Sequence, residues 1–226
     1  MFNASNSRKF PLSLSQLNIL NLERVLVGTA VNNISTTIRI DGRLDFPMLQ
    51  KTIRLILKSD DSLRTRLVEE DGTVLQYHAP FEEEEFPVYD FSNTSRDGVE
   101  NWETALTREP ISLFGGPLYR FVLFRDSEKG GGVLVKLHHI IADGWTQIML
   151  CNKIARTYLD LLAGKTPDLP EAPDYELHVE EEREYLQSKA FARDEQYWKE
   201  TVQMVGEPSM LKSVSSAAAI SRNGWI

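Results

Sequence analysis

A strand that leads through a short turn into a long helix constrains the fold of this chain more than any other feature. Residues 133–139 have strand length and are largely apolar up to the two histidines at their end. From Thr146 to Ala163, apolar residues recur at helical spacing. The connecting turn contains Asp143 and Gly144. The pattern predicts an α/β unit with ionisable groups where the strand ends and the helix begins.

The start of the chain is predicted to form a helix, a strand and a second helix. Ser13 and Gln16 have the spacing of a capping box, at the start of a helix that runs towards Val27. Leucines on several sides of this helix indicate that it is buried between other elements. Residues 33–40 alternate and contain β-branched side chains, as in a strand, and residues 46–58 show helical periodicity.

The middle of the chain is predicted to consist mainly of strands joined by turns. Strands are expected over residues 63–68, 74–77, 118–125 and 133–139. The first two flank an acidic Asp-Gly turn and read as a hairpin, and Gly130–Gly132 are expected in the turn between the last two. We expect an α/β fold with a mixed, largely antiparallel sheet covered by helices.

A segment with several prolines divides the chain. Residues 165–173 contain three prolines and no periodic pattern, which is typical of a linker. Residues 175–205 form a charged, mostly helical stretch with a broken apolar stripe. We therefore expect one lobe over residues 1–173 and a charged helical segment with a tail over residues 174–226.

Composition excludes several classes of partner. The 226 residues carry a formal net charge of −8, which repels nucleic-acid phosphates and anionic lipid surfaces. No apolar run reaches the roughly 18 residues that a membrane span needs, and the N-terminus lacks a secretory signal. Neither nucleic acid nor a membrane is expected as a partner, and the expected location is the cytoplasm. The single cysteine excludes an internal disulfide.

The two adjacent histidines are the candidate chemical groups. Successive strand residues point to opposite faces, so His138 and His139 cannot face one site in a regular strand. Steps of two place His139 on the more apolar face, with Leu137, Val135 and Val133. Desolvation there favours an uncharged imidazole, the form that accepts a proton. His139 is therefore the candidate general base.

Structural roles remain open for the same residues. A histidine at a strand end is usually a satisfied structural group, and an aspartate just before a helix, such as Asp143, is most often its cap. A metal site needs at least three convergent ligands, which adjacent histidines on opposite faces do not supply, so no metal is expected. No serine or cysteine nucleophile accompanies the histidines in the local sequence. If His139 is a base, it acts without a covalent enzyme intermediate.

Residues 138–146 resemble the His-His-x-x-x-Asp-Gly motif of the condensation domains of nonribosomal peptide synthetases. These domains belong to the chloramphenicol acetyltransferase-like superfamily, in which acyltransferases that use coenzyme A share the motif. Residues 11–16 resemble the opening motif of condensation domains, and Leu63-Arg64-Thr65 resembles their Leu-Arg-Thr motif. Residues 195–199 resemble their Tyr-Trp helix, and the order of all these motifs also matches.

The chain departs from the family pattern in three places. Ser59-Asp60-Asp61 stand where the family usually has Arg-His-Glu, and residues 175–178 match the next motif only loosely. A family domain is a pair of similar lobes with an active tunnel between them, and the resemblance covers the N-terminal lobe alone. The resemblance therefore implies that the isolated chain has little or no turnover.

The resemblance implies a role for each matching residue. His139 is the catalytic histidine, acting on the acceptor amine, and His138 and Asp143 are structural. The motif's aspartate is typically tied to an arginine, so Arg64 is expected to form a buried charge pair with Asp143. Gly144 is expected to let the backbone approach the substrate closely.

The function implied is amide-forming condensation in secondary metabolite biosynthesis. A donor acyl or aminoacyl thioester is attacked by the amine of an acceptor aminoacyl thioester, and both are held on phosphopantetheine arms of carrier proteins. No cofactor is expected to bind the chain directly, and the partners are the carrier proteins and the second lobe. The alternatives are an acyltransferase that uses free coenzyme A thioesters and a non-catalytic lobe that docks carrier proteins.

Overall fold

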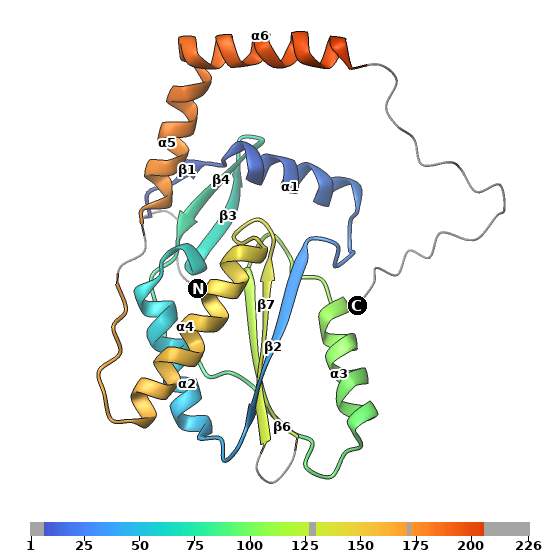
Figure 1. Cartoon of the computed structure of the whole chain (residues 1–226), viewed down its shortest axis with the longest axis vertical. Coiled ribbons are helices and arrows are strands. Elements are labelled where there is room, and N and C mark those ends of the chain that lie inside the picture. The colour runs from blue at the N-terminus through green and yellow to red at the C-terminus, as the bar shows by residue number, and fades with distance from the viewer. Residues whose placement is uncertain (1–6, 127–129, 171–172, 206–226) are drawn as a thin grey trace, which may run out of the picture. The chain divides into compact units, whose positions relative to one another are not determined.

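The computed structural model describes residues 7–126, 130–170 and 173–205 (Figure 1). The chain divides into two compact units, residues 1–180 and residues 181–226. The division lies within helix α5, Tyr175–Leu186. The assignment of residues 1–173 to one lobe and of 174–226 to a segment leading out of it remains a prediction.

The first unit is built on a four-stranded sheet with the order β2-β7-β6-β5. Its strands are β2 (Asn33–Asp41), β5 (Val88–Asp90), β6 (Tyr119–Arg125) and β7 (Gly130–His138). β7 pairs antiparallel with both β2 and β6, whereas β5 runs parallel to β6. This confirms the mixed, largely antiparallel sheet. The sequence did not predict β5, whose three residues are all exposed.

The triple glycine lies inside β7, so its prediction as part of a turn is wrong. A Cβ atom on Gly132 would lie 1.9 Å from the carbonyl oxygen of Ile38 in β2. A Cβ atom on Gly131 would lie 2.3 Å from the carbonyl oxygen of Phe124 in β6. Glycine is required here because the neighbouring backbones approach too closely for a side chain.

A second, three-stranded sheet has the order β1-β4-β3. It consists of β1 (Phe10–Pro11), β3 (Thr65–Glu70) and β4 (Thr73–His78). The predicted hairpin is confirmed, since β3 and β4 pair antiparallel. Asp71 and Gly72 form its turn with φ values of 50° and 75°, a region that Gly and Asp tolerate better than most residues. A short 3-10 helix, Ser62–Arg64, precedes β3.

Helices cover both faces of the four-stranded sheet. α2 (Phe46–Ser59) and α4 (Gly144–Leu162) lie on one face and α3 (Arg96–Arg108) on the other (Figure 1). Alternate residues of β7 enter different apolar clusters. Val133, Val135 and Leu137 pack with Ile53, Ile56 and Ile154, whereas Leu134 packs with Leu106 and Val122. β7 is therefore buried on both faces, and each such side chain contributes roughly 1.5–3 kcal/mol.

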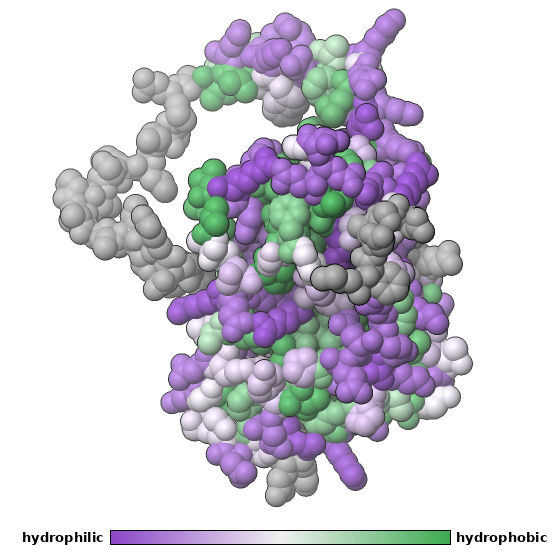
Figure 2. Space-filling model, turned by 180° about the vertical axis from the view of Figure 1, so that it is seen from behind, coloured by the Kyte–Doolittle hydropathy of each residue, from purple (hydrophilic) through white to green (hydrophobic). Residues whose placement is uncertain are grey.

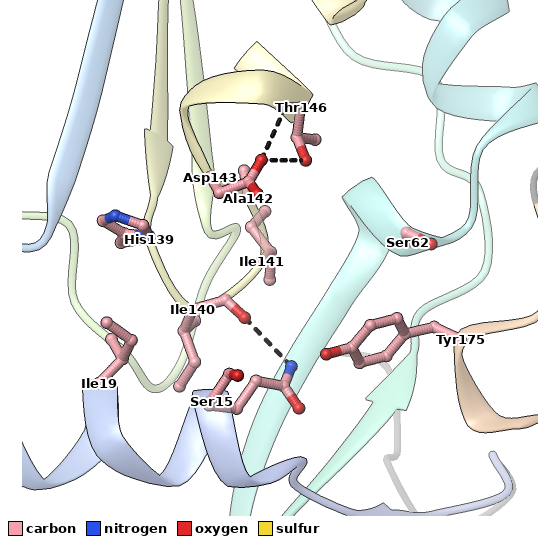
Figure 3. A pocket seen from close by; sticks show the side chains of 11 residues that line it. Ser15, Ile19, Ser62, His139, Ile140, Ile141, Ala142, Asp143, Thr146 and Tyr175 are labelled. Atoms are coloured by element: carbon pink, nitrogen blue, oxygen red, sulfur yellow. Dashed lines mark hydrogen bonds between the residues drawn. The ribbon is translucent and has the colours of Figure 1, made fainter. Parts of the chain in front are cut away.

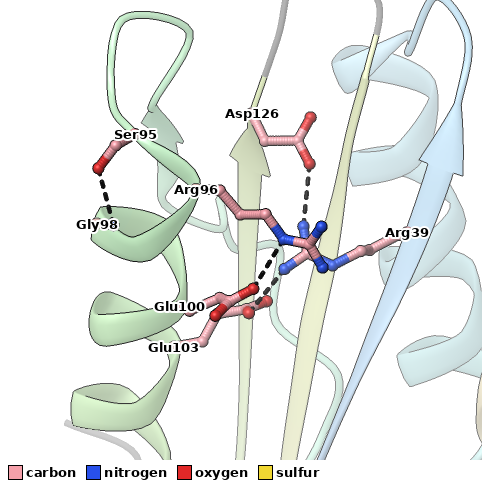
Figure 4. A network of polar contacts seen from close by, with 7 residues as sticks. All are labelled: Arg39, Ser95, Arg96, Gly98, Glu100, Glu103 and Asp126. Atoms are coloured by element: carbon pink, nitrogen blue, oxygen red, sulfur yellow. Dashed lines mark hydrogen bonds and ion pairs between the residues drawn. The ribbon is translucent and has the colours of Figure 1, made fainter.

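Ion pairs join α3 to the sheet at its exposed edge (Figure 4). Arg39 of β2 donates to Glu103 of α3 at 2.7 Å and to Asp126 at 3.0 Å. Its guanidinium also lies 5.2 Å from the ring centroid of Phe124. Ser95 caps α3 by accepting the amide of Gly98. The Arg39–Glu103 pair links α3 to β2 on the face opposite α2 and α4.

Helix α1 (Leu14–Val25) has the predicted capping box but lies at the surface. Only Gln16 and Leu20 are buried, so the prediction that the helix is enclosed on several sides is wrong. Leu14, Leu17 and Leu22 are exposed, and Val25 is 78% exposed. Figure 2 shows apolar surface where α1 ends. One face of α1 is thus fixed against the first unit and the opposite face is open.

The predicted helical stretch over residues 175–205 is two helices. α5 ends at Leu186, and Ser188 caps α6 (Lys189–Met204). In the second unit, Tyr185 lies edge-on to Phe191 and its hydroxyl donates to Asp194 at 3.0 Å. No helix in the described part of the chain has the length and apolarity needed to cross a membrane.

Candidate active site

A cavity of about 400 Å³ lies beyond the end of β7, within the first unit (Figure 3). Segments that are far apart in the sequence line it. They are Ser15, Gln16 and Ile19 of α1, Ser62 of the 3-10 helix, residues 139–143, Thr146 of α4 and Tyr175 of α5. The cavity therefore combines apolar walls with hydroxyl and imidazole groups, as small-molecule sites do.

His139 is the first residue after β7 and lines this cavity. Its backbone N–H donates to the carbonyl oxygen of Asn32 at 2.6 Å, which fixes the start of the turn over residues 139–141. The side chain is half-buried. Among the described residues, none forms a hydrogen bond with either ring nitrogen of His139. The imidazole is therefore available to contact a molecule in the cavity.

His138 is the histidine that the fold removes from solvent, with 1% exposure. Its Nδ1 accepts the N–H of Ile140 at 3.1 Å, and its Nε2 lies 3.7 Å from Oε2 of Glu23. Burial lowers the pKa of His138, and the nearby Glu23 carboxylate opposes this shift. The prediction that desolvation acts chiefly on His139 is wrong. β7 ends at His138, so the alternation of faces does not continue into the turn.

Asp143 caps helix α4 and is exposed. Its Oδ1 accepts hydrogen bonds from the amide and the hydroxyl of Thr146, each at 2.7 Å (Figure 3). The hydrogen bond from the backbone N–H of Thr146 is the main reason that the pKa of Asp143 is lowered. Of the roles that the sequence leaves open for this residue, the structure displays the helix cap.

Arg64 does not pair with Asp143, so the predicted buried charge pair is wrong. The guanidinium donates to the carbonyl oxygens of Ala79 at 2.9 Å and Lys58 at 3.2 Å, and also to that of Leu57. Leu57 and Lys58 lie in the last turn of α2, where carbonyl groups lack helical partners and attract cations. Arg64 lines a second cavity, of about 390 Å³, which Asp143 does not reach.

Gly144 is the first residue of α4 and is exposed. A Cβ atom placed on Gly144 would meet no atom within 4 Å. No contact within the described chain therefore requires glycine at this position. The close approach of a substrate to Gly144 stays a prediction.

The structure adds three positioning groups that the sequence did not assign to the site. Gln16 donates to the carbonyl oxygen of Ile140 at 3.1 Å. Glu23 accepts the side-chain N–H of Asn32 and lies 3.7 Å from Nε2 of His138. Gln16, Leu20 and Glu23 follow the i, i+4, i+7 spacing of one helix face. The polar residues Gln16 and Glu23, on the same helix face as the buried Leu20, were the sequence signal that could have indicated these roles.

Comparisons with known proteins agree with this arrangement. Residues 6–220 match the family model for the condensation domain. A linear gramicidin synthase protein of Brevibacillus parabrevis is 30% identical over 198 residues, which are 85% of this chain and 3% of that protein. Surfactin synthase subunit 1 of Bacillus subtilis (strain 168) is 28% identical over 214 residues, which are 92% of this chain and 6% of that protein.

The fold is also that of solved condensation domains. The starter condensation domain of rhizomide synthetase RzmA superposes with a TM-score of 0.81 at 24% identity. The match covers 89% of this chain and 50% of the solved one. This chain thus spans about half the length of that domain and a small part of the synthetases. By its family match, its order of elements and its histidine-bearing turn, the chain belongs to the condensation-domain family.

Proposed function

We propose that this chain supplies the histidine-bearing half of an active site that forms amide bonds between acyl groups held on carrier proteins. The observation that carries the proposal is the position of His139. It lies at the end of β7 in a cavity, with neither ring nitrogen hydrogen-bonded by the described residues. The condensation-domain match over residues 6–220 indicates the reaction class for which this histidine is available.

The proposed reaction is acyl transfer from sulfur to nitrogen. The acceptor amine attacks the carbonyl carbon of the donor thioester, so a C–N bond forms and the C–S bond breaks. The imidazole of His139 accepts the proton that the amine loses and then gives it to the departing thiolate, which leaves as a thiol. The acyl group passes directly to the amine, so the step needs no covalent enzyme intermediate and no oxidant.

The remaining site residues act by position in this proposal. His138 accepts the amide of Ile140 and Asp143 starts α4, so both shape the segment that presents His139. Gly144 leaves room beside this segment for the thioester. The chain needs no cofactor of its own, because the phosphopantetheine arms belong to the carrier proteins.

The test replaces His139 in a two-lobe version of the domain. Carrier proteins loaded with donor and acceptor are mixed with the enzyme, and the amide product is measured by mass spectrometry. General-base catalysis is worth about 10²–10⁴-fold, so His139→Ala should lower the rate by at least about 100-fold. Arg24→Gln is the control, since Arg24 is exposed and does not line the cavity.

Wild-type condensation by His139→Ala contradicts the catalytic proposal and favours a lobe that only docks carrier proteins. The 226-residue chain alone is assayed beside the two-lobe version, with little or no turnover expected. Robust condensation by the chain alone contradicts the expectation that a second lobe completes the site.

A free acyl-coenzyme A donor is the second candidate. A mutant of the starter condensation domain of rhizomide synthetase RzmA has been crystallised in complex with C8-CoA. Supplying the same acyl group on a carrier protein and on coenzyme A, at equal concentrations, separates the two donors. A higher kcat/KM with the carrier protein supports condensation, and a higher value with coenzyme A supports the second candidate.

A further inference from the structure

One carboxylate oxygen of Glu23 lies between the two groups that hold the turn after β7. Glu23 Oε2 accepts the side-chain N–H of Asn32 at 2.6 Å and lies 3.7 Å from Nε2 of His138. The carbonyl oxygen of Asn32 accepts the N–H of His139, and Nδ1 of His138 accepts the N–H of Ile140. Glu23 thus contacts, through other atoms, both residues that accept successive amides of the turn.

We propose that Glu23 is a positioning residue that sets the orientation of His139 through Asn32 and His138. This inference rests on the proposed function for its effect on turnover, but not for its effect on the turn. Glu23 does not line the cavity, so it does not touch the substrate. It acts through the two residues that bind the backbone on either side of the His139 side chain.

The protonation pattern of His138 supports this role. Because Nδ1 accepts the amide of Ile140, the ring proton of neutral His138 lies on Nε2. This buried Nε2 has no hydrogen-bond partner among the described residues, and the Glu23 carboxylate lies 3.7 Å away. A buried donor without a partner is costly, so a nearby anion favours the tautomer that leaves Nδ1 free for the turn.

The burial of the three side chains makes the effect of Glu23 strong. His138 is 1% exposed, Asn32 is 3% exposed and the Glu23 side chain is 16% exposed. Electrostatic interactions are stronger in such surroundings than they are in water. A change at Glu23 therefore reaches both supports of the turn.

Helix α1 fixes the other side of the same turn. Gln16 donates to the carbonyl oxygen of Ile140, and it lies two helical turns before Glu23 on the inward face of α1. A shift or rotation of α1 consequently changes contacts to Ile140, Asn32 and His138 together. Glu23 is the charged one of the two anchors.

The first test measures the turn itself in the 226-residue chain by NMR. In Glu23→Ala, the amides of His139 and Ile140 should exchange with solvent at least about tenfold faster, because their acceptors lose a support. The matched control is Arg24→Gln, which removes an exposed charge from the same helix. Unchanged exchange in folded Glu23→Ala overturns the proposal, as does equal acceleration in Arg24→Gln.

A second variant decides the matter if Glu23→Ala does not fold. In Glu23→Gln, the amide oxygen can still accept from Asn32 and face Nε2 of His138, but the negative charge is lost. The titratable groups that act on His138 are Glu23 and His139, and Glu23 raises the pKa of His138. Amide exchange in the turn should therefore remain within about threefold of wild type while the NMR titration midpoint of His138 falls. An unchanged midpoint overturns the proposal.

Turnover is measured in the two-lobe version of the domain. Misplaced catalytic groups mainly slow the chemical step, so Glu23→Ala should lower kcat by about tenfold or more with KM within about twofold. Glu23→Gln should restore most of kcat. If His139→Ala abolishes condensation and Glu23→Ala leaves kcat unchanged, positioning is overturned. If His139→Ala retains wild-type condensation, the proposed function fails, and the NMR results still decide the role of Glu23 in the turn.

Discussion

The Nζ atom of Lys136 donates a hydrogen bond to the carbonyl oxygen of Leu106 at 2.8 Å, from a side chain with no solvent exposure. The same amine also donates to the carbonyl oxygen of Glu109, which directly follows α3. Lys136 lies in β7, on the sheet face that α3 covers. A buried amine thus ties the end of α3 to the strand that leads into the histidine-bearing turn.

This lysine should make stability depend on alkaline pH. Burial lowers the pKa of Lys136 to about 8, with Arg120 adding to the shift and Glu109 opposing it. Between that value and an unfolded value of about 10.4, the unfolded chain binds more protons than the folded chain. The free energy of unfolding contributed by Lys136 therefore rises with pH, by on the order of 2 kcal/mol across this window.

Urea unfolding of Lys136→Met and wild type at several pH values checks this expectation. From pH 8 to 10, the free energy of unfolding of wild type should rise relative to that of Lys136→Met. The control is Lys51→Met, which removes a lysine at an exposed position. The same pH dependence in both variants would contradict the expectation for the buried amine.

Gly132→Ala should destabilise the sheet strongly. Its new Cβ atom would lie 1.9 Å from a backbone oxygen of Ile38, which cannot move without breaking the pairing of β2 with β7. Overpacking of this kind costs about 1–3 kcal/mol or more, measured by thermal unfolding. Gly144→Ala is the matched control for stability, because its Cβ atom meets nothing within 4 Å. Equal stability of the two variants would contradict the close approach.

Asp143→Ala should cost about 1 kcal/mol of stability, as the loss of a helix cap does. Asp143→Asn should cost less, because its amide oxygen can still accept from Thr146. The lowered pKa of Asp143 gives this cap a pH dependence. The charge of Asp143 contributes fully to the free energy of unfolding above the pKa of the carboxyl group in the unfolded chain. This contribution is lost as the pH falls through the lowered pKa of the folded protein. Chemical unfolding between pH 7 and 2 measures both effects.

Arg64 and Asp143 should contribute to stability independently. Arg64→Met removes donors to carbonyl groups at the end of α2, whereas Asp143→Ala uncaps α4. In a double-mutant cycle the two losses should add within about 0.5 kcal/mol. A coupling energy of several kcal/mol would instead indicate the ion pair that the family resemblance implies and that this fold lacks.

The sequence predicts most elements, because apolar periodicity and capping residues are local signals. The capping box of Ser13 and Gln16, the hairpin and the helices over 46–58 and 146–163 are all found. β5 was missed because three exposed residues carry no period. Gly130–Gly132 were misplaced because glycine marks both turns and close backbone contacts, and only the neighbouring strands distinguish the two.

The candidate site was predictable only in part. The sequence placed His139 at the end of an apolar strand, and the structure places it one residue beyond β7. The contacts of its neighbours could not be read from the sequence. Arg64 binds carbonyl oxygens at the end of α2 instead of Asp143, and no sequence motif indicates this choice of partner. The role of Glu23 depends on α1 lying against residues 32 and 138, which is a matter of tertiary structure.

The glycines of β7 also govern the alignment of the site with the rest of the sheet. β2 and β7 pair from Asn33 opposite His138 to Asp41 opposite Gly130. A slip of one residue would exchange the two faces of β7 and bring a side chain against the backbone that now faces glycine. The glycines at one end of the strand pair therefore fix its register. This register in turn determines where the histidines lie at the other end.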